Sequence, residues 1–359
     1  MYIVTNRNIE TGNAGLDVFG PHPSPKGPNE LRLVEITELN HQWQSKILDD
    51  ELTSEQVMAL ANKHHLSLDM NTTWYASLEV ACKIFAQAQK EHKNILFFVH
   101  GYNNSMPDVI TTLKEIEDRY SVIPVGFSWP ANGGGTGAAA YLSDKKDARA
   151  SCDALNRFIE KIQFYHNLLT QSLQDRLQNK ASEKYGDNYM AVQNYYAKLL
   201  AKNCKTKLTL VCHSMGNYLM KYALFPSDGG SRKLVFDNVA LVAADANNES
   251  HELWLHAIQT RNRVYITINE DDYALKWSRR KPGQEQKARL GHYRKGLIAR
   301  NATYIDVTNA SYVGNSHSYF KSKPVIKNKK LHQLFEDIFS GERVDDRLKY
   351  HPDVNVYTL

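Results

Sequence analysis

Short apolar runs alternate with helical patterns along most of the chain. Several of these runs are apolar at nearly every position instead of every second one, as a strand buried on both faces requires. Strands that alternate with helices in this way are typical of a parallel sheet. The pattern predicts a doubly wound, mostly parallel α/β sheet with helices on both sides, built from runs at residues 95–99, 122–129, 208–211, 239–244, 264–268 and 304–307.

The first 92 residues carry a weaker version of the same pattern. Residues 2–5 and 31–36 are candidate strands that can extend the sheet at one edge. Between residues 53 and 92 the pattern is helical, with an apolar stripe at steps of three and four that we expect to face the core: Trp74, Leu78, Ala81 and Ile84.

Composition and charge narrow the function classes. The 359 residues are 42% hydrophobic and 23% charged, which is ordinary for a globular protein with a sizeable core. A net charge of +5 is too small to indicate nucleic-acid binding. Basic residues concentrate at 276–300, where we expect a solvated loop; the alternative is a patch that steers an anionic substrate towards a cleft.

The sequence contains no candidate membrane segment. No stretch approaches the roughly 18 apolar residues of a membrane helix, and the first residues lack the apolar core of a signal peptide. We therefore predict a cytoplasmic protein without an integral membrane segment. The four cysteines are far apart and too few for a disulfide framework, so we expect reduced thiols at Cys82, Cys152, Cys204 and Cys212.

One predicted strand leads into a turn that is typical of a nucleophilic serine. Residues 208–212 are followed by His213, Ser214, Met215 and Gly216, after which the pattern becomes helical. In the nucleophile elbow G-x-S-x-G, small residues lie two positions on either side of the serine because the turn brings neighbouring backbones close together. Here the compact Cys212 takes the first of these positions and a glycine takes the second. The pattern predicts Ser214 as the nucleophile.

A second motif ends the predicted strand at residues 95–99, where His100, Gly101 and Tyr102 follow. A strand that ends in His-Gly is typical of a loop whose backbone N–H groups stabilise the oxyanion formed in acyl transfer. Each such donor can be worth roughly 10²–10³ in rate. We predict the backbone N–H groups of Tyr102 and Met215 as the two donors, and we expect the His100 side chain to brace the loop.

A serine at such a turn works with an acid and a histidine that follow later strands, in that chain order. His317 is the only histidine in the loop after the last predicted strand, and we predict it as the general base. Asp271 and Asp272 follow the preceding strand, and Asp245 follows the one before that. The residues alone leave these three open as the orienting acid, with Asp272 preferred.

These motifs together resemble a branch of bacterial α/β hydrolases known as a domain of unknown function. The resemblance implies the α/β-hydrolase fold and a triad of Ser214, Asp272 and His317. It favours Asp272 because Ala274 and Leu275 follow it. It covers residues 95–320 and rests on five motifs in order, at residues 99–105, 127–130, 212–217, 272–275 and 317–319.

The pattern and the resemblance predict two parts of the chain. Residues 93–359 are the α/β-hydrolase catalytic domain, and residues 1–92 extend its core. Residues 153–205 carry two amphipathic patterns without a strand between them and predict an inserted helical hairpin. Its aromatic residues either form a lid over an apolar acyl chain or pack the hairpin onto the body: Tyr185, Tyr189, Tyr195 and Tyr196.

The predicted reaction is hydrolysis of a carboxylic ester or thioester through a Ser214 acyl-enzyme. The substrate is a small molecule, and the mechanism needs neither a metal nor an organic cofactor. The alternative is a catalytically idle scaffold that binds a partner, since a fold does not by itself prove an activity.

Two further partial motifs do not predict a cofactor or metal site. Residues 133–138 fit the dinucleotide-binding pattern G-x-G-x-x-A, but no helix pattern starts at once after the glycines, so we expect an active-site loop. His251 and His256 resemble the zinc motif H-E-x-x-H, but they are one residue too far apart to share a helix face. We expect both histidines at the surface.

Overall fold

The computed structural model describes residues 1–10, 12–13, 15–131, 135, 137–203, 206–224, 234–280 and 287–359. In the glycine-rich run that fits G-x-G-x-x-A, Gly133, Gly134 and Thr136 lie outside the described residues, as do Cys204 and Lys281.

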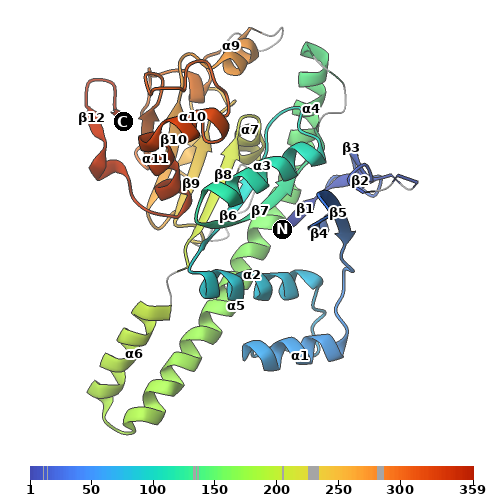
Figure 1. The fold of residues 1–359 in the computed structure, drawn as a ribbon, viewed down its shortest axis with the longest axis vertical. Helices are drawn as coiled ribbons and strands as arrows, with labels where there is room; N and C mark the ends of the chain where they lie inside the picture. Colours follow the sequence, from blue (N-terminus) through green and yellow to red (C-terminus); the bar gives the residue numbers. More distant parts are fainter. Residues whose placement is uncertain are drawn as a thin grey trace.

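The described residues form one large twisted sheet with helices on both faces (Figure 1). The strand order is β12-β13-β11-β10-β9-β8-β6-β7-β1-β4-β5, and every neighbouring pair from β13 to β1 is parallel. The strands of this sheet are β1 (Tyr2–Thr5), β4 (Arg32–Leu39), β5 (Gln42–Ile47), β6 (Asn94–Val99), β7 (Val122–Ser128), β8 (Leu208–His213), β9 (Asn238–Val242), β10 (Arg263–Ile268), β11 (Ala302–Asp306), β12 (Lys349–His351) and β13 (Val356–Thr358).

The six predicted central strands, β6 to β11, are all present and confirm the predicted α/β architecture. They are buried along nearly their whole length, which explains their unbroken apolar runs. The first predicted N-terminal strand, β1, pairs in parallel with β7, and the second, β4, pairs with β1 in antiparallel fashion. The N-terminal strands therefore continue the central sheet at one edge.

The strands that the pattern missed lie at the edges or outside the large sheet. In β5 only every second residue is even partly buried, and β12 is mostly exposed, so neither needs a long apolar run. β13 joins β12 to the sheet. β2 (Arg7–Ile9) and β3 (Phe19–Pro23) form a separate two-stranded sheet.

Two apolar layers cover the sheet. Residues of α2, α4, α5, α7 and α8 share one core cluster, and residues of α3, α9, α10 and α11 share the other. The helices are α1 (Ser54–His64), α2 (Ala76–Glu91), α3 (Met106–Arg119), α4 (Ala138–Ala150), α5 (Cys152–Tyr185), α6 (Tyr189–Asn203), α7 (Gly216–Ala223), α8 (Glu252–Leu255), α9 (Tyr273–Arg279), α10 (Ser322–Lys327) and α11 (Lys329–Phe339), with single 3₁₀ turns at Leu290–His292 and Asp345–Arg347.

The helices α5 and α6 form a hairpin that extends away from the sheet, on the side opposite α9 (Figure 1). The 34 residues of α5 make a helix roughly 50 Å long. Its first half packs on the sheet through Leu155, Phe158 and Ile162, and its second half packs against α6. α6 leads back to the start of β8, so the hairpin lies beyond the N-terminal ends of the parallel strands.

Among the described residues, no helix is both long enough and apolar enough to span a membrane. The predicted division into residues 1–92 and 93–359 stays a prediction.

Candidate active site

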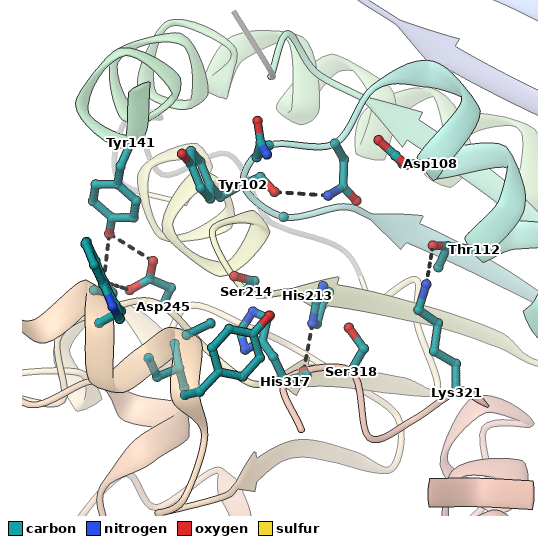
Figure 2. Close-up of a pocket in the computed structure, with 18 of the residues that line it drawn as sticks. Tyr102, Asp108, Thr112, Tyr141, His213, Ser214, Asp245, His317, Ser318 and Lys321 are labelled. Atoms are coloured by element: carbon teal, nitrogen blue, oxygen red, sulfur yellow. Dashed lines mark hydrogen bonds between the residues drawn. The ribbon is translucent and has the colours of Figure 1, made fainter. Parts of the chain in front are cut away.

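A pocket of about 770 Å³ opens at the C-terminal ends of the parallel strands (Figure 2). In an open α/β sheet this is the edge where ligands bind. The segments that follow β6, β8, β9, β10 and β11 each contribute to its wall. In that order, they supply Tyr102, Ser214, Asp245, Ala274 and His317. The three residues predicted from the motifs to carry the chemistry therefore lie at or beside one cavity.

Ser214 forms the turn between β8 and α7 and has a left-handed backbone, with φ of 53°. This conformation costs a residue other than glycine about 1–3 kcal/mol, so the surrounding structure must impose it. The Ser214 N–H donates to the Val242 carbonyl at 3.0 Å. The buried Asn217 amide donates to the carbonyls of Cys212 and Ser214 at 2.9 and 3.1 Å and fastens both sides of the turn.

The elbow packs directly against the loop after β6. A Cβ atom on Gly216 would lie 2.7 Å from the carbonyl oxygens of Val99 and His100. A Cβ atom on Gly101 would lie 2.6 Å from the Cβ of Ser214. Both positions therefore need glycine, because contacts this short do not occur between real side chains. The backbone that carries the predicted oxyanion donors is thereby held against the serine.

His100 braces this loop, as we expected from the sequence. Its ring is fully buried, stacks on Trp129 with centroids 5.0 Å apart, and accepts the Trp129 N–H at Nε2. Nδ1 then donates to the Gly101 carbonyl at 2.8 Å. Burial, assisted by the charge of Arg7, lowers the pKa of His100 to about 3, so the ring is neutral at physiological pH.

Arg7 holds the same loop from the N-terminal segment. Its buried guanidinium donates to the Asn104 carbonyl at 2.5 Å, to the Ala131 carbonyl at 3.0 Å and to the Ser128 hydroxyl at 2.9 Å. The loops after β6 and β7 are thus tied to the first strands of the chain. The sequence did not predict this role, because a single arginine at the start of a short strand carries no local signal of its partners.

His317 is paired with Asp272. The Nδ1 atom of His317 lies 2.7 Å from Oδ2 of Asp272, whose side chain is fully buried. The other oxygen, Oδ1, accepts the backbone N–H groups of Ala274 and Leu275 at 2.9 and 3.0 Å, because Asp272 is also the N-cap of α9. The neighbouring Asp271 is exposed. The geometry therefore joins the histidine to the preferred acid of the three.

Asp245, the third candidate acid, is engaged elsewhere. Its carboxylate accepts hydrogen bonds from Tyr141 at 2.8 Å (Figure 2) and from Ser278 at 2.6 Å. It also forms an ion pair with Arg289 at 3.1 Å. Arg289 is only 2% exposed, so the expectation of a solvated basic loop at residues 276–300 is wrong at this position. The ion pair explains its burial, since a buried arginine needs a compensating charge.

The backbone of the His317 loop is fastened to neighbouring strands by two buried side chains. Nε2 of His213 lies 3.1 Å from the His317 carbonyl oxygen, and the Tyr319 hydroxyl accepts the Ala243 N–H at 3.1 Å and contacts Thr267. Burial, and next the charge that His317 can carry, hold the pKa of His213 well below its ordinary value. His213 is therefore a neutral residue of the pocket wall, as expected, and not a second base.

The two residues predicted as oxyanion donors are Met215 and Tyr102. Met215 is buried and follows Ser214 directly, and in the described part of the chain no acceptor pairs with its N–H. Tyr102 lines the pocket, and its ring lies edge-on to Tyr141 with centroids 5.5 Å apart. Their role as donors stays a prediction.

A comparison with protein families agrees with this geometry. The chain matches the model of a family described as alpha/beta hydrolase of unknown function (DUF900), over residues 79–172 and 170–336. The chain belongs to this family. The match confirms the resemblance inferred from the motifs, and its two segments meet inside α5 of this α/β hydrolase. Neither the curated proteins nor the solved structures gave a match.

The α5–α6 hairpin is not a lid in this structure. Among the described residues, none from α5 or α6 lines the pocket, and the hairpin lies at the opposite end of the strands. Its aromatic residues do not pack onto the body as a group either. Tyr185 and Tyr195 contact each other edge-on at 5.4 Å, while Tyr189 at the tip is 71% exposed.

His251 also differs from expectation. It is fully buried instead of exposed, and its ring nitrogens contact the Asn248 carbonyl and the Tyr304 hydroxyl, each at 2.6 Å. These partners satisfy both nitrogens within the core. His256 lies at the surface, as expected.

Proposed function

We propose that the protein is a serine hydrolase that cleaves a carboxylic ester or thioester through a Ser214 acyl-enzyme. One observation carries the proposal: a serine in a left-handed elbow lies in the same pocket as a histidine whose far nitrogen is bound by a buried carboxylate. A backbone strain of this kind persists where surrounding contacts impose it, and such sites cluster at active centres.

In this mechanism His317 is the general base. Its Nδ1–H donates to Asp272, so the neutral ring carries its lone pair on Nε2, where it can take the proton of the Ser214 hydroxyl. Asp272 stabilises the imidazolium that forms. The two backbone N–H groups on Oδ1 keep that carboxylate oriented with Oδ2 towards the histidine.

Ser214 Oγ then attacks the carbonyl carbon, and the carbonyl oxygen becomes an oxyanion. The N–H groups of Tyr102 and Met215 are proposed to donate to it, which lowers the barrier because fixed donors need no reorganisation during the step. The imidazolium of His317 protonates the leaving alcohol or thiol as the C–O or C–S bond breaks. Water, deprotonated by the same histidine, then hydrolyses the acyl-enzyme. No step needs a metal or an organic cofactor.

The experiment that tests this function is covalent labelling of the folded native protein with a fluorophosphonate, followed by intact-protein mass spectrometry. We expect one adduct in the native protein, none in Ser214→Ala and much slower labelling in His317→Ala. Ser316→Ala is the matched control, because this serine lies beside His317 but does not line the pocket; it should be labelled like the native protein. Native protein that folds but takes no adduct would contradict the proposal and favour the idle scaffold.

A further inference from the structure

The pocket wall opposite Asp245 contains a lysine that the proposed mechanism does not use. Lys321 lies in this wall together with Thr112, Asp108 and Ser318 (Figure 2). It lies four residues after His317 and directly before α10. Its Nζ donates to the hydroxyl of Thr112 at 2.8 Å, and Thr112 is itself buried.

The closest partner of this ammonium group is neutral. Within the described residues, no carboxylate oxygen lies within the 4.0 Å ion-pair distance of Lys321 Nζ. Burial lowers the pKa of Lys321, while the charges of Glu115 and Asp108 act in the opposite direction. A cation that is partly withdrawn from water and hydrogen-bonded only to a hydroxyl gains strongly from a bound anion.

The nearby acids are occupied by other groups. Asp108 is exposed, and its carboxylate accepts the backbone N–H and the hydroxyl of Ser105 at 2.8 and 2.6 Å. Glu115 pairs with Arg119 at 2.9 Å and accepts the Ser322 N–H at 2.6 Å. His213, on the same wall, is neutral for the reason given above. Lys321 is therefore a cation of this wall that has no ion-pair partner among the described residues.

We propose that Lys321 binds an anionic group of the substrate, so that the enzyme prefers esters that bear a carboxylate. This inference rests on the proposed function of the same pocket. Thr112 can take part, because its oxygen accepts from the lysine and its own O–H remains able to donate to the anion. One ammonium matches the single charge of a carboxylate, whereas a phosphate monoester carries nearly two charges, which one ammonium would leave partly uncompensated.

The test compares matched esters that differ only in charge. Mono-4-nitrophenyl adipate is compared with 4-nitrophenyl hexanoate for an anion on the acyl side, and 4-carboxyphenyl hexanoate with 4-carbamoylphenyl hexanoate for an anion on the leaving group. In at least one pair we expect the native enzyme to favour the anionic ester. Lys321→Met, of similar length but neutral, should lower the ratio of kcat/KM about tenfold, as loss of one charged hydrogen bond predicts.

Two further variants separate binding from a structural effect. Lys321→Arg keeps the charge and should retain most of the preference. Lys323→Met removes a charge from an exposed lysine two residues away, which does not line this pocket, and should leave the ratio unchanged. Equal ratios in the native enzyme and Lys321→Met for both ester pairs would overturn the inference, even if all hydrolysis disappears in Ser214→Ala and the proposed function stands.

A binding measurement separates failure of this inference from failure of the proposed function. Titration calorimetry needs no turnover and compares the acid products of the two anionic esters, adipate and 4-hydroxybenzoate, with their neutral amides, adipamide and 4-hydroxybenzamide. At least one of the two anions should bind the native protein at least tenfold more tightly than it binds Lys321→Met, and the neutral amides should show no such dependence. If both anions bind the two proteins equally, or bind neither, the lysine site is refuted whether or not any ester is cleaved.

Discussion

Two buried aspartates follow neighbouring strands of the sheet, and their surroundings are opposite in kind. Asp245 follows β9 and is enclosed by an arginine and two hydroxyl groups. Asp272 follows β10 and is enclosed by two backbone N–H groups and an imidazole. Their exposed fractions, 4% and 0%, do not distinguish them.

The partners determine what each carboxylate can do. An arginine keeps its proton at all relevant pH values, so the Asp245–Arg289 pair is a fixed pair of charges that holds the pocket wall. An imidazole takes up and releases a proton near neutral pH, so the Asp272–His317 pair can support proton transfer. The comparison teaches that the proton-carrying partner, and not burial, marks the acid that can serve catalysis.

The largest expected effect tests this division directly. Asp272→Asn should lower kcat by about 10⁴, because an amide donates to Nδ1 and forces the wrong tautomer of His317. Asparagine is as good an N-cap as aspartate, so α9 should remain folded. The measurement is kcat for a hydrolysed ester, with circular dichroism as the control for folding.

Asp245→Asn is the matched control, because it makes the same chemical change at the neighbouring strand end. It should cost at most about tenfold in kcat. A loss of several orders of magnitude in Asp245→Asn, with Asp272→Asn active, would reverse our assignment of the acid.

The second prediction concerns stability. Arg289→Met should lower the free energy of unfolding by about 3–5 kcal/mol, because it leaves the buried Asp245 without its compensating charge. The double variant Asp245→Asn with Arg289→Met should lose less than the sum of the two single variants, as expected for residues in one network. Urea unfolding measures both; additive losses would mean that the pair is not coupled.

The third prediction uses pH to examine the neutral His100, which braces the loop after β6. The folded pKa of His100 is lowered to about 3, below an unfolded value of 6.5, so between these values the unfolded chain binds the additional proton. The contribution of His100 to stability is therefore complete above pH 6.5. It is lost as the pH falls towards 3, by up to about 1.4 kcal/mol per pH unit.

His100→Asn should reduce that slope, whatever its effect on the absolute stability. Denaturant unfolding at several pH values between 7 and 4 measures it. The same slope in the native protein and the variant would show that other groups cause the acid loss.

The smallest expected effect refines the Asp245 network. Tyr141→Phe removes the hydroxyl that contacts Asp245 at 2.8 Å and Ser278 at 3.0 Å. We expect a loss of about 1.5–3 kcal/mol, as for one hydrogen bond to a charged group, and a smaller loss when Asp245 is already asparagine. A stability equal to that of the native protein would place the hydroxyl outside the network.

The fold was predictable where a structural constraint acts on neighbouring residues of the chain. A strand buried on both faces must be apolar throughout, so β6 to β11 were readable, whereas the half-exposed β5 was not. The elbow was readable for a similar reason, because its turn restricts residue size at Cys212 and Gly216.

The partners of buried polar residues were not predictable, because they are distant in sequence. The sequence preferred Asp272 but left Asp245 open, because nothing in it showed that Arg289 lies beside Asp245. For the same reason His251 was wrongly expected at the surface, since its partner Tyr304 belongs to another strand. Arg7 carried no signal at all, because its acceptors are the Ser128 hydroxyl and backbone carbonyls that are remote in sequence.

The position of β1 inside the sheet has a consequence for synthesis on the ribosome. β1, β4 and β5 can pair as soon as β5 has emerged, because their antiparallel contacts are local. The other edge of β1 pairs with β7, where Tyr2 lies beside Val125, and must wait until that strand is made. Until β7 is made, the ribbon of β1, β4 and β5 therefore exposes one open strand edge, and an open edge of this kind can pair with another chain.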